Sequence, residues 1–345
     1  MAYNNVVDTI TLEDIAPRVV DTVLRTNRLT TKVLSKTKAF RAATQDFPIK
    51  YQVGTPVQSF VGFDALPVNF TDTRVLLKYN PKFVAANMAL AGTDIMANNV
   101  IRKVLDLTKI EMISRAQDLA DAIGTMLYAD GTGNNSKDFL GLKAIVDDGT
   151  NVSTIGGLSR STYPTLKGTV TSASTLALTT MRTLWNTIGD MGVYPDVIFT
   201  DYPSFSYYEQ LLQPQEKIYK ELTFNPDYKM YEGVKEDGLA WAGMSVWPDR
   251  KCTAGYMYML NTDFLHFYAL DAELPPQFGD AKKVDVGSKL FTGNQYNETP
   301  NLGFYWTNFI KINNQFAFNS FIIQAGNLLT DDPRRHGVLT GIAGI

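Results

Sequence analysis

The chain has 345 residues, with 32 basic and 35 acidic side chains and a net charge of -3. This length exceeds the ~250–300 residues at which a single hydrophobic core stops growing, so it predicts two packed units or one unit with long extensions. The single cysteine and two histidines exclude a disulfide-stapled fold and a structural zinc site. The near-neutral charge argues against a dedicated nucleic-acid binder.

Membrane insertion and secretion are also disfavoured. No uncharged apolar run approaches the ~20 residues needed to span a bilayer. The segment Met1–Leu12 lacks the basic and apolar blocks of a signal peptide. We therefore expect a protein that is made and kept in a cytoplasm and has no membrane partner.

The first biased segment, residues 22–45, contains basic side chains and no acid. Four of these side chains recur three and four residues apart, which places them on one face of a helix. This basic stripe comprises Arg25, Arg28, Lys32 and Lys36. The stripe predicts an arm that contacts an anionic surface, and a solvated helix face without a partner carries equal weight.

From Phe47 the apolar period changes to two, and the same alternation returns from Val75 to Tyr79. About twenty residues punctuated by glycine and proline separate the two runs, which predicts a long two-stranded ribbon with an irregular tip. Such a ribbon is only marginally stable alone in water, so it either folds back on its own domain or is covered by a neighbouring molecule. Candidate anchors near the tip are Phe60, Phe63 and Phe70. Packing on their own domain is the alternative.

A strand predicted over 83–90 precedes the clearest element. Apolar or small residues repeat at steps of three and four from about Ile95 to Ala129, which predicts a helix of about nine turns ended by the glycines after Asp130. Residues 134–265 then read as loop, helix, strand and helix, typical of an α/β unit. Alternating aromatic runs from Gly255 onward predict strands that pack on the long helix, with the α/β unit inserted between.

This order of elements resembles the major capsid proteins of tailed bacteriophages, which share the Hong Kong ninety-seven fold. Residues 156–161, with the sequence GGLSRS, and the ending from GNLL at 326–329 to PRRHGVL at 333–339 agree with the resemblance. It implies an α+β phage capsid fold with an N-arm, an extended β-hairpin loop, a peripheral domain with a long spine helix, and an inserted α/β axial domain. The implied segments are 1–45 for the N-arm, 46–80 for the extended loop, 81–135 with 265–325 for the peripheral domain, 136–264 for the axial domain, and 326–345 for a C-terminal tail.

Catalytic and cofactor signals are weak. Gly131-Thr132-Gly133 follows a helix instead of opening one, so it does not fit a phosphate-binding loop. His266 falls in an apolar strand and His336 in the charged ending, so neither suggests a triad. Asp147-Asp148 and Asp331-Asp332 read as turns. We expect no catalytic residue, no cofactor and no metal site.

The resemblance implies a shell built from pentamers and hexamers of this chain around non-specifically held double-stranded DNA. It also implies a virion assembled in a bacterial cytoplasm, with a separate scaffold, a portal and a candidate decoration protein as partners. Some relatives crosslink a loop lysine to an asparagine of a neighbour. Lys50 and Lys78 fall at the base of the loop without a recognisable signal, so we expect no crosslink. A nanocompartment shell of the same fold, and a carbohydrate-active enzyme or binding module, remain alternatives.

Overall fold

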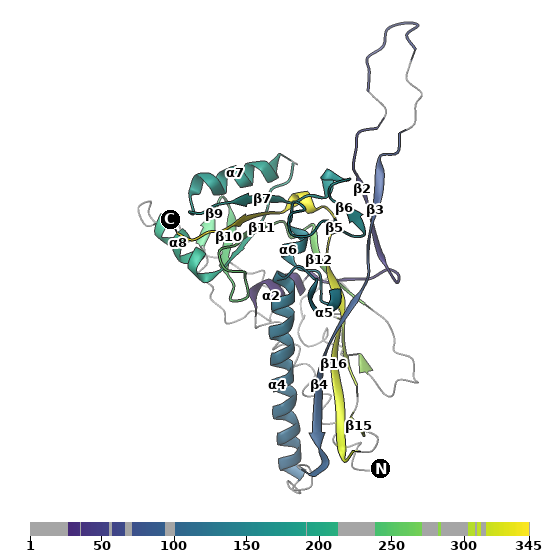
Figure 1. Cartoon of the computed structure of the whole chain (residues 1–345), viewed down its shortest axis with the longest axis vertical. Coiled ribbons are helices and arrows are strands. Elements are labelled where there is room, and N and C mark those ends of the chain that lie inside the picture. The colour runs from purple at the N-terminus through teal and green to yellow at the C-terminus, as the bar shows by residue number, and fades with distance from the viewer. Residues whose placement is uncertain are drawn as a thin grey trace, which may run out of the picture.

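The computed structural model describes residues 27–34, 36–54, 57–65, 71–93, 101–190, 192–212, 239–270, 282–283, 303–307, 309–311 and 315–344. For residues 101–110, 113, 282, 283 and 306 it describes the backbone only. Two sheets with one long helix between them form the body, and a hairpin arm extends from it (Figure 1). The fold is therefore of the α+β class that the sequence predicts.

The first sheet has seven strands among the described residues, in the order β1-β12-β16-β14-β13, with β4 and β15 also paired to β16. Its strands are β1 Lys38–Ala39, β4 Lys82–Ala91, β12 Leu265–Ala269, β13 Lys282–Lys283, β14 Phe304–Trp306, β15 Ile310–Lys311 and β16 Ala317–Thr330. The central strand, β16, is 14 residues long and pairs antiparallel with β4 from Ala317↔Ala91 to Gly326↔Lys82. Segments far apart in the sequence thus build one sheet.

The long helix α4 spans Ile101–Tyr128, within the predicted 95–129; residues 94–100 lie outside the described part of the chain. At 1.5 Å per residue its 28 residues extend about 42 Å. Buried positions recur along one side at Met112, Ala116, Leu119, Ile123 and Leu127. Gly131, with φ +75°, supplies the left-handed residue after the helix that the sequence predicts.

The second sheet has six strands among the described residues, in the order β7-β17-β11-β8-β10-β9. Its strands are β7 Thr169–Ser172, β8 Val197–Thr200, β9 Leu239–Trp241, β10 Met244–Pro248, β11 Met257–Leu260 and β17 Gly337–Thr340. The helices α7, Leu178–Gly189, and α8, Tyr202–Leu212, pack on it. We call this sheet with its two helices the six-stranded unit.

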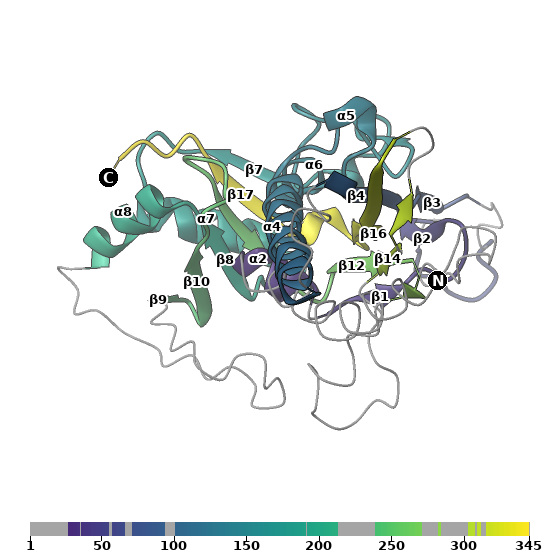
Figure 2. The same cartoon turned by 90° about the horizontal axis from the view of Figure 1, so that it is seen from below.

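Figure 2 shows α4 nearly end-on, between the two sheets. One hydrophobic cluster joins Leu119 and Ile123 of α4 to Phe267 of β12 and to Phe199 and Tyr258 of the six-stranded unit. Burial of apolar surface on both sides of α4 therefore holds the two sheets together. The long helix covers the aromatic strands, as predicted, and it also covers part of the six-stranded sheet.

The ending of the chain differs from the expected tail over 326–345. The strand β16 continues to Thr330, the short 3-10 helix η4 covers Pro333–Arg335, and β17 pairs with both β7 and β11. The short apolar run Gly337–Thr340 satisfies its backbone groups between two partner strands, which a solvated tail cannot do. The ending is thus part of both sheets.

The predicted ribbon is present. Strands β2, Gln45–Lys50, and β3, Arg74–Tyr79, pair antiparallel from Gln45↔Tyr79 to Lys50↔Arg74. The described residues of the connection, 51–54, 57–65 and 71–73, extend well beyond the rest of the fold (Figure 1). The remaining short elements are α2 Arg28–Leu34, α5 Gly133–Ser136, α6 Leu142–Ile145, β5 Thr154–Ile155, β6 Leu158–Ser159 and η1 Pro164–Leu166.

Candidate functional surfaces

The tip of the hairpin arm presents apolar side chains to solvent. Val57 is 97% exposed and Phe60 59% exposed, while Phe63 is fully exposed. Val53 and Val61 are also exposed. Phe60 and Phe63, two of the predicted anchors, therefore do not pack on their own domain in this structure, and Phe70 lies outside the described residues. Clustered exposed apolar side chains of this kind mark an interaction surface.

The root of the arm, in contrast, is firmly packed. Ile49 of β2 and Leu77 of β3 are buried in a cluster with Ile155 of β5 and Tyr268 of β12. The amide of Lys78 donates to the carbonyl of Gly156 at 3.0 Å, in the turn between β5 and β6. A Cβ at Gly156, whose φ is +53°, would collide with the Leu77 side chain. The glycine in the GGLSRS segment is therefore needed for the β5–β6 hairpin to lie against the arm.

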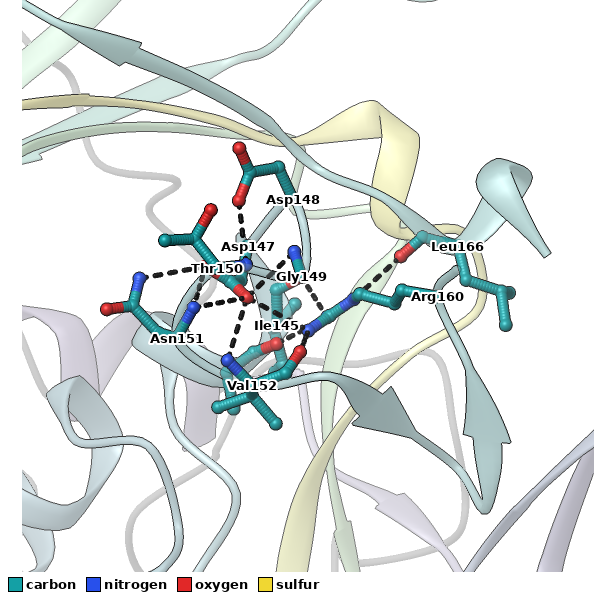
Figure 3. Close-up of polar contacts among 10 residues, drawn as sticks. Ile145, Asp147, Asp148, Gly149, Thr150, Asn151, Val152, Arg160 and Leu166 are labelled. Carbon is teal, nitrogen blue, oxygen red and sulfur yellow. Dashed lines mark hydrogen bonds and ion pairs between the residues drawn. The ribbon is translucent and has the colours of Figure 1, made fainter. Parts of the chain in front are cut away.

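A buried ion pair braces this hairpin (Figure 3). Arg160 and Asp147 are both fully buried, and their Nη1 and Oδ2 atoms lie 3.4 Å apart. Arg160 also donates to four backbone carbonyls, those of Ala144, Ile145, Val152 and Leu166. Burial lowers the pKa of Arg160, and the Asp147 carboxylate opposes that shift. One side chain thus ties η1 and the 144–152 loop to β6.

The Asp147 carboxylate also accepts hydrogen bonds from the loop that follows it. It accepts from the amides of Gly149 at 3.0 Å and Val152 at 2.9 Å, and from the Asn151 side chain at 2.8 Å. The adjacent acids Asp147 and Asp148 therefore mark a turn, as predicted. The Arg160–Asp147 pair therefore has a structural role. The sequence showed Arg160 only as part of the GGLSRS segment, because its bonding partners cannot be identified from sequence.

The helix α2 fastens the N-terminal segment to the body. Asn27 precedes α2 and accepts from the Thr31 amide at 3.0 Å, while its side chain donates to the Ala120 carbonyl of α4 at 3.3 Å. A Cβ at Gly124 of α4 would overlap the Asn27 amide. The Leu29 amide donates to Asp249, just after β10, at 3.0 Å. Thus α2 contacts both the long helix and the six-stranded unit.

The described members of the basic stripe meet groups of their own chain. Arg28 lies over the Trp247 ring, 5.3 Å from its centroid. Lys36 donates to Thr262 at 2.8 Å and lies 3.4 Å from Asp263. Burial lowers the pKa of Lys32, and the charge of Asp196 opposes this effect. Arg25 lies outside the described residues. The contacts of Lys36 join residues more than 200 positions apart in the sequence, so periodicity alone did not reveal them.

Comparison with known proteins was made by sequence and by structure. No family model and no curated protein matches the chain. The capsid asymmetric unit of cyanophage A-1(L) matches with a TM-score of 0.69 at 16% identity, covering 91% of this chain and 92% of that one. The chain has the Hong Kong ninety-seven fold.

Two further matches to the Hong Kong ninety-seven fold have TM-scores of 0.52. One is the capsid of a native GTA particle, at 8% identity and 91% coverage of both chains. The other is an encapsulin complex, SrpI of Synechococcus elongatus, at 12% identity, covering 91% of this chain and 86% of that one. At these identities the likeness establishes the fold.

Within this Hong Kong ninety-seven fold the histidines are structural. His336 is fully buried, its Nδ1 accepting from the Asn261 amide at 3.3 Å and its Nε2 lying 3.1 Å from the Thr330 hydroxyl. The sequence predicted a C-terminal tail here, but His336 is buried because the next residue begins β17, which pairs with β7 and β11. Burial lowers its pKa to about 4. His266 bonds the Asp263 carbonyl at 2.9 Å.

The lysines considered for crosslinking lie on the arm, Lys50 opposite Arg74 and Lys78 opposite Asp46. Burial raises the pKa of the Cys252 thiol, which disfavours the reactive thiolate. Within the described ranges, no three His, Cys, Asp or Glu residues gather as metal ligands. No helix in those ranges combines the length and apolar character that crossing a bilayer requires.

Proposed function

We propose that this chain is the major capsid protein of a tailed bacteriophage. Copies would assemble through pentamers and hexamers into the icosahedral head that encloses double-stranded DNA. The observation that carries this proposal is the hairpin arm, whose root is packed in the core and whose apolar tip is bare. The structural matches support it, since two of the three reported above are capsids.

The arm explains why copies would associate. A two-stranded ribbon gains little stability alone, and each fully buried Val or Phe side chain contributes about 1.5–3 kcal/mol. Covering Val57, Phe60 and Phe63 with a second copy would therefore supply binding energy that the monomer does not use. A contact between different surfaces of identical copies is heterologous, and it closes into a ring when the rotation between copies closes.

The two sheets support the proposed domain assignment. The seven-stranded sheet with α4 would form the peripheral domain, and the six-stranded unit would form the axial domain around the fivefold and sixfold centres. Pairing adds two short pieces to the expected ranges, because β16 reaches Thr330 and β17 joins the six-stranded sheet. The region 1–45 would remain the N-arm and 46–80 the extended loop.

The basic stripe would act mainly within the subunit. The contacts of Arg28 with Trp247 and of Lys36 with Asp263 support docking of the N-arm on its own body. Contact of the stripe with DNA or a neighbour would then depend chiefly on Arg25. Weak attraction to phosphate suits a container that must release its genome, because each engaged cation adds to the salt-dependent affinity.

The remaining partners and the location follow from the same proposal. A separate scaffold, a portal and a decoration protein would complete the head. Assembly would take place in the bacterial cytoplasm and end in the virion. The chain would act as a structural protein without enzymatic activity, and the matched capsid structures support this.

A nanocompartment shell of the same fold is the second candidate, favoured by the match to the encapsulin complex. Both functions require a closed shell, so the contents distinguish them. The test is size-exclusion chromatography and electron microscopy of the purified chain, followed by analysis of native particles. A capsid protein forms hollow shells that hold nuclease-protected DNA in native particles, whereas a nanocompartment holds protein. Monomers under all conditions would contradict both.

A further inference from the structure

Four side chains on the six-stranded unit form a stack that we call the aromatic ladder: Tyr194, Trp185, Arg182 and Trp241. The Tyr194 and Trp185 rings are stacked, 4.1 Å apart at 15°. The Arg182 guanidinium lies 5.0 Å from the Trp185 centroid and 4.9 Å from the Trp241 centroid. Arg182 is exposed, and Tyr194 is 50% exposed. The ladder therefore reaches the surface.

The local backbone is arranged to build this ladder. A Cβ at Gly189, the last residue of α7, would overlap the Tyr194 ring, so the glycine lets that ring lie against the helix end. Trp241 ends β9 beside a two-residue turn, in which Ala242 and Gly243 have φ of +49° and +85°. Positive φ at both positions is typical of the tight type I′ hairpin turn, and it costs energy at a non-glycine residue.

Arg182 is held but not hydrogen-bonded. It makes two cation-π contacts, and within the described part of the chain no carboxylate or carbonyl accepts a hydrogen bond from it. A guanidinium carries five N–H donors in a planar fork that matches a carboxylate. Because both tryptophan rings already restrict the side chain, less conformational entropy remains to be lost when an anion binds.

We propose that Arg182, positioned by the aromatic ladder, binds a carboxylate side chain of a second copy of this chain. This inference rests on the proposed function, in which six-stranded units surround the symmetry axes. A sister copy can supply the carboxylate, because each six-stranded unit carries an exposed acid, Asp190, at the end of α7. Arginine, tryptophan and tyrosine are also the residues that dominate interface energies. The half-exposed Tyr194 ring also favours a protein partner, because a protein surface would cover this ring whereas a small anion would leave it exposed.

The test compares three variants with the wild-type chain by thermal unfolding and by the subunit concentration at which shells form. Arg182→Gln removes the charge and the fork, and Arg182→Lys keeps the charge alone. Arg250→Gln is the matched control, because Arg250 is an exposed arginine near the same sheet whose ion pair is to Asp121 of its own chain, at 3.3 Å.

We expect Arg182→Gln to unfold at a slightly lower temperature than the wild type, because it loses two exposed cation-π contacts. It should also need a roughly 10-fold higher concentration to assemble, since a charge-assisted hydrogen bond contributes about one decade of affinity. Arg182→Lys should lie between, and Arg250→Gln should match the wild type. If Arg182→Gln does not fold, Arg182→Lys tests the proposal by the same two measurements. The proposal then requires that Arg182→Lys raise the concentration at which shells form.

Three results would overturn the proposal while leaving the capsid function intact. Assembly of Arg182→Gln at the wild-type concentration would show that no partner carboxylate is bound. A loss of assembly that disappears when each variant is compared equally far below its own unfolding temperature would assign Arg182 a structural role. Assembly at the wild-type concentration, together with less DNA in native particles of the variant, would indicate a phosphate partner. Failure of the unaltered chain to assemble is different, because it removes the proposed function and this inference together.

Discussion

Replacing Arg160 with methionine probes how the root of the arm is held. The substitution removes a fully buried guanidinium that donates to Asp147 and to four backbone carbonyls. Removing one partner of a buried ion pair costs about 3–5 kcal/mol, because the other groups remain desolvated without a partner. We therefore expect Arg160→Met to lower the free energy of unfolding by about 3–5 kcal/mol.

The reciprocal change, Asp147→Asn, keeps the shape of the side chain and removes its charge. It should also cost about 3–5 kcal/mol, because it leaves the buried charge of Arg160 without its counter-ion. The double variant should cost less than the sum of the two, since both single changes break the same contact. A measured coupling near zero would contradict a functional pairing of these two residues.

The assay is urea unfolding at neutral pH, followed by tryptophan fluorescence, with the slopes compared to confirm one kind of transition. Arg250→Met serves as the control, because its pair with Asp121 is exposed and such surface pairs contribute about 0–1 kcal/mol. A loss below about 1 kcal/mol for Arg160→Met would refute the reasoning, since the buried arginine would then behave like a surface one.

Three further predictions concern the arm tip, the buried histidine and the docking of α2. Phe63→Ser should change the free energy of unfolding by no more than about 0.5 kcal/mol, yet raise the concentration needed for assembly roughly 10-fold. Phe267→Ser in the core should instead prevent folding. Assembly of Phe63→Ser at the wild-type concentration would contradict the prediction. Burial lowers the pKa of His336 to about 4, so the unfolded chain binds this proton first as the pH falls from 6.5, and about 3 kcal/mol of stability should be lost by pH 4. Urea unfolding at pH 7 and 4.5 should show that His336→Gln loses less stability on acidification than the wild type. An identical loss in the two proteins would count against the lowered pKa of His336. Gly124→Ala should destabilise the chain by about 1 kcal/mol, because the new Cβ clashes with Asn27. In an Asn27→Ala background the same change should stabilise the chain, since only the higher helix propensity of alanine remains. A change of unfolding free energy in the same direction in both backgrounds would refute the docking of α2 on α4 through Asn27.

Local patterns were sufficient to predict the elements that depend on local physics. The repeat from Met112 to Leu127 reports one buried helix face, and the period-two runs around Phe47 and Leu77 report a ribbon with one buried face. The glycine after α4 was recognisable because only glycine readily adopts a left-handed backbone. These features need no knowledge of distant partners.

Features that depend on long-range pairing could not be predicted in the same way. The charge of Lys36 is bound by Asp263, 227 residues away, so the segment looked like a free basic helix face, although α2 ends at Leu34. His336 looked exposed because charged residues precede it, yet β17 pairs between β7 and β11. The stacking of Trp185 on Tyr194, and the position of Arg182 between Trp185 of α7 and Trp241 of β9, became visible only in the folded chain.

The central claim is that the bare arm tip belongs on another copy of the chain. Electron cryomicroscopy of particles formed by the purified protein tests it most directly. The account predicts closed shells in which the side chain of Phe63 is covered by a neighbouring subunit at every arm. Compact single molecules under all conditions, or shells whose arm tips point into solvent, would contradict it.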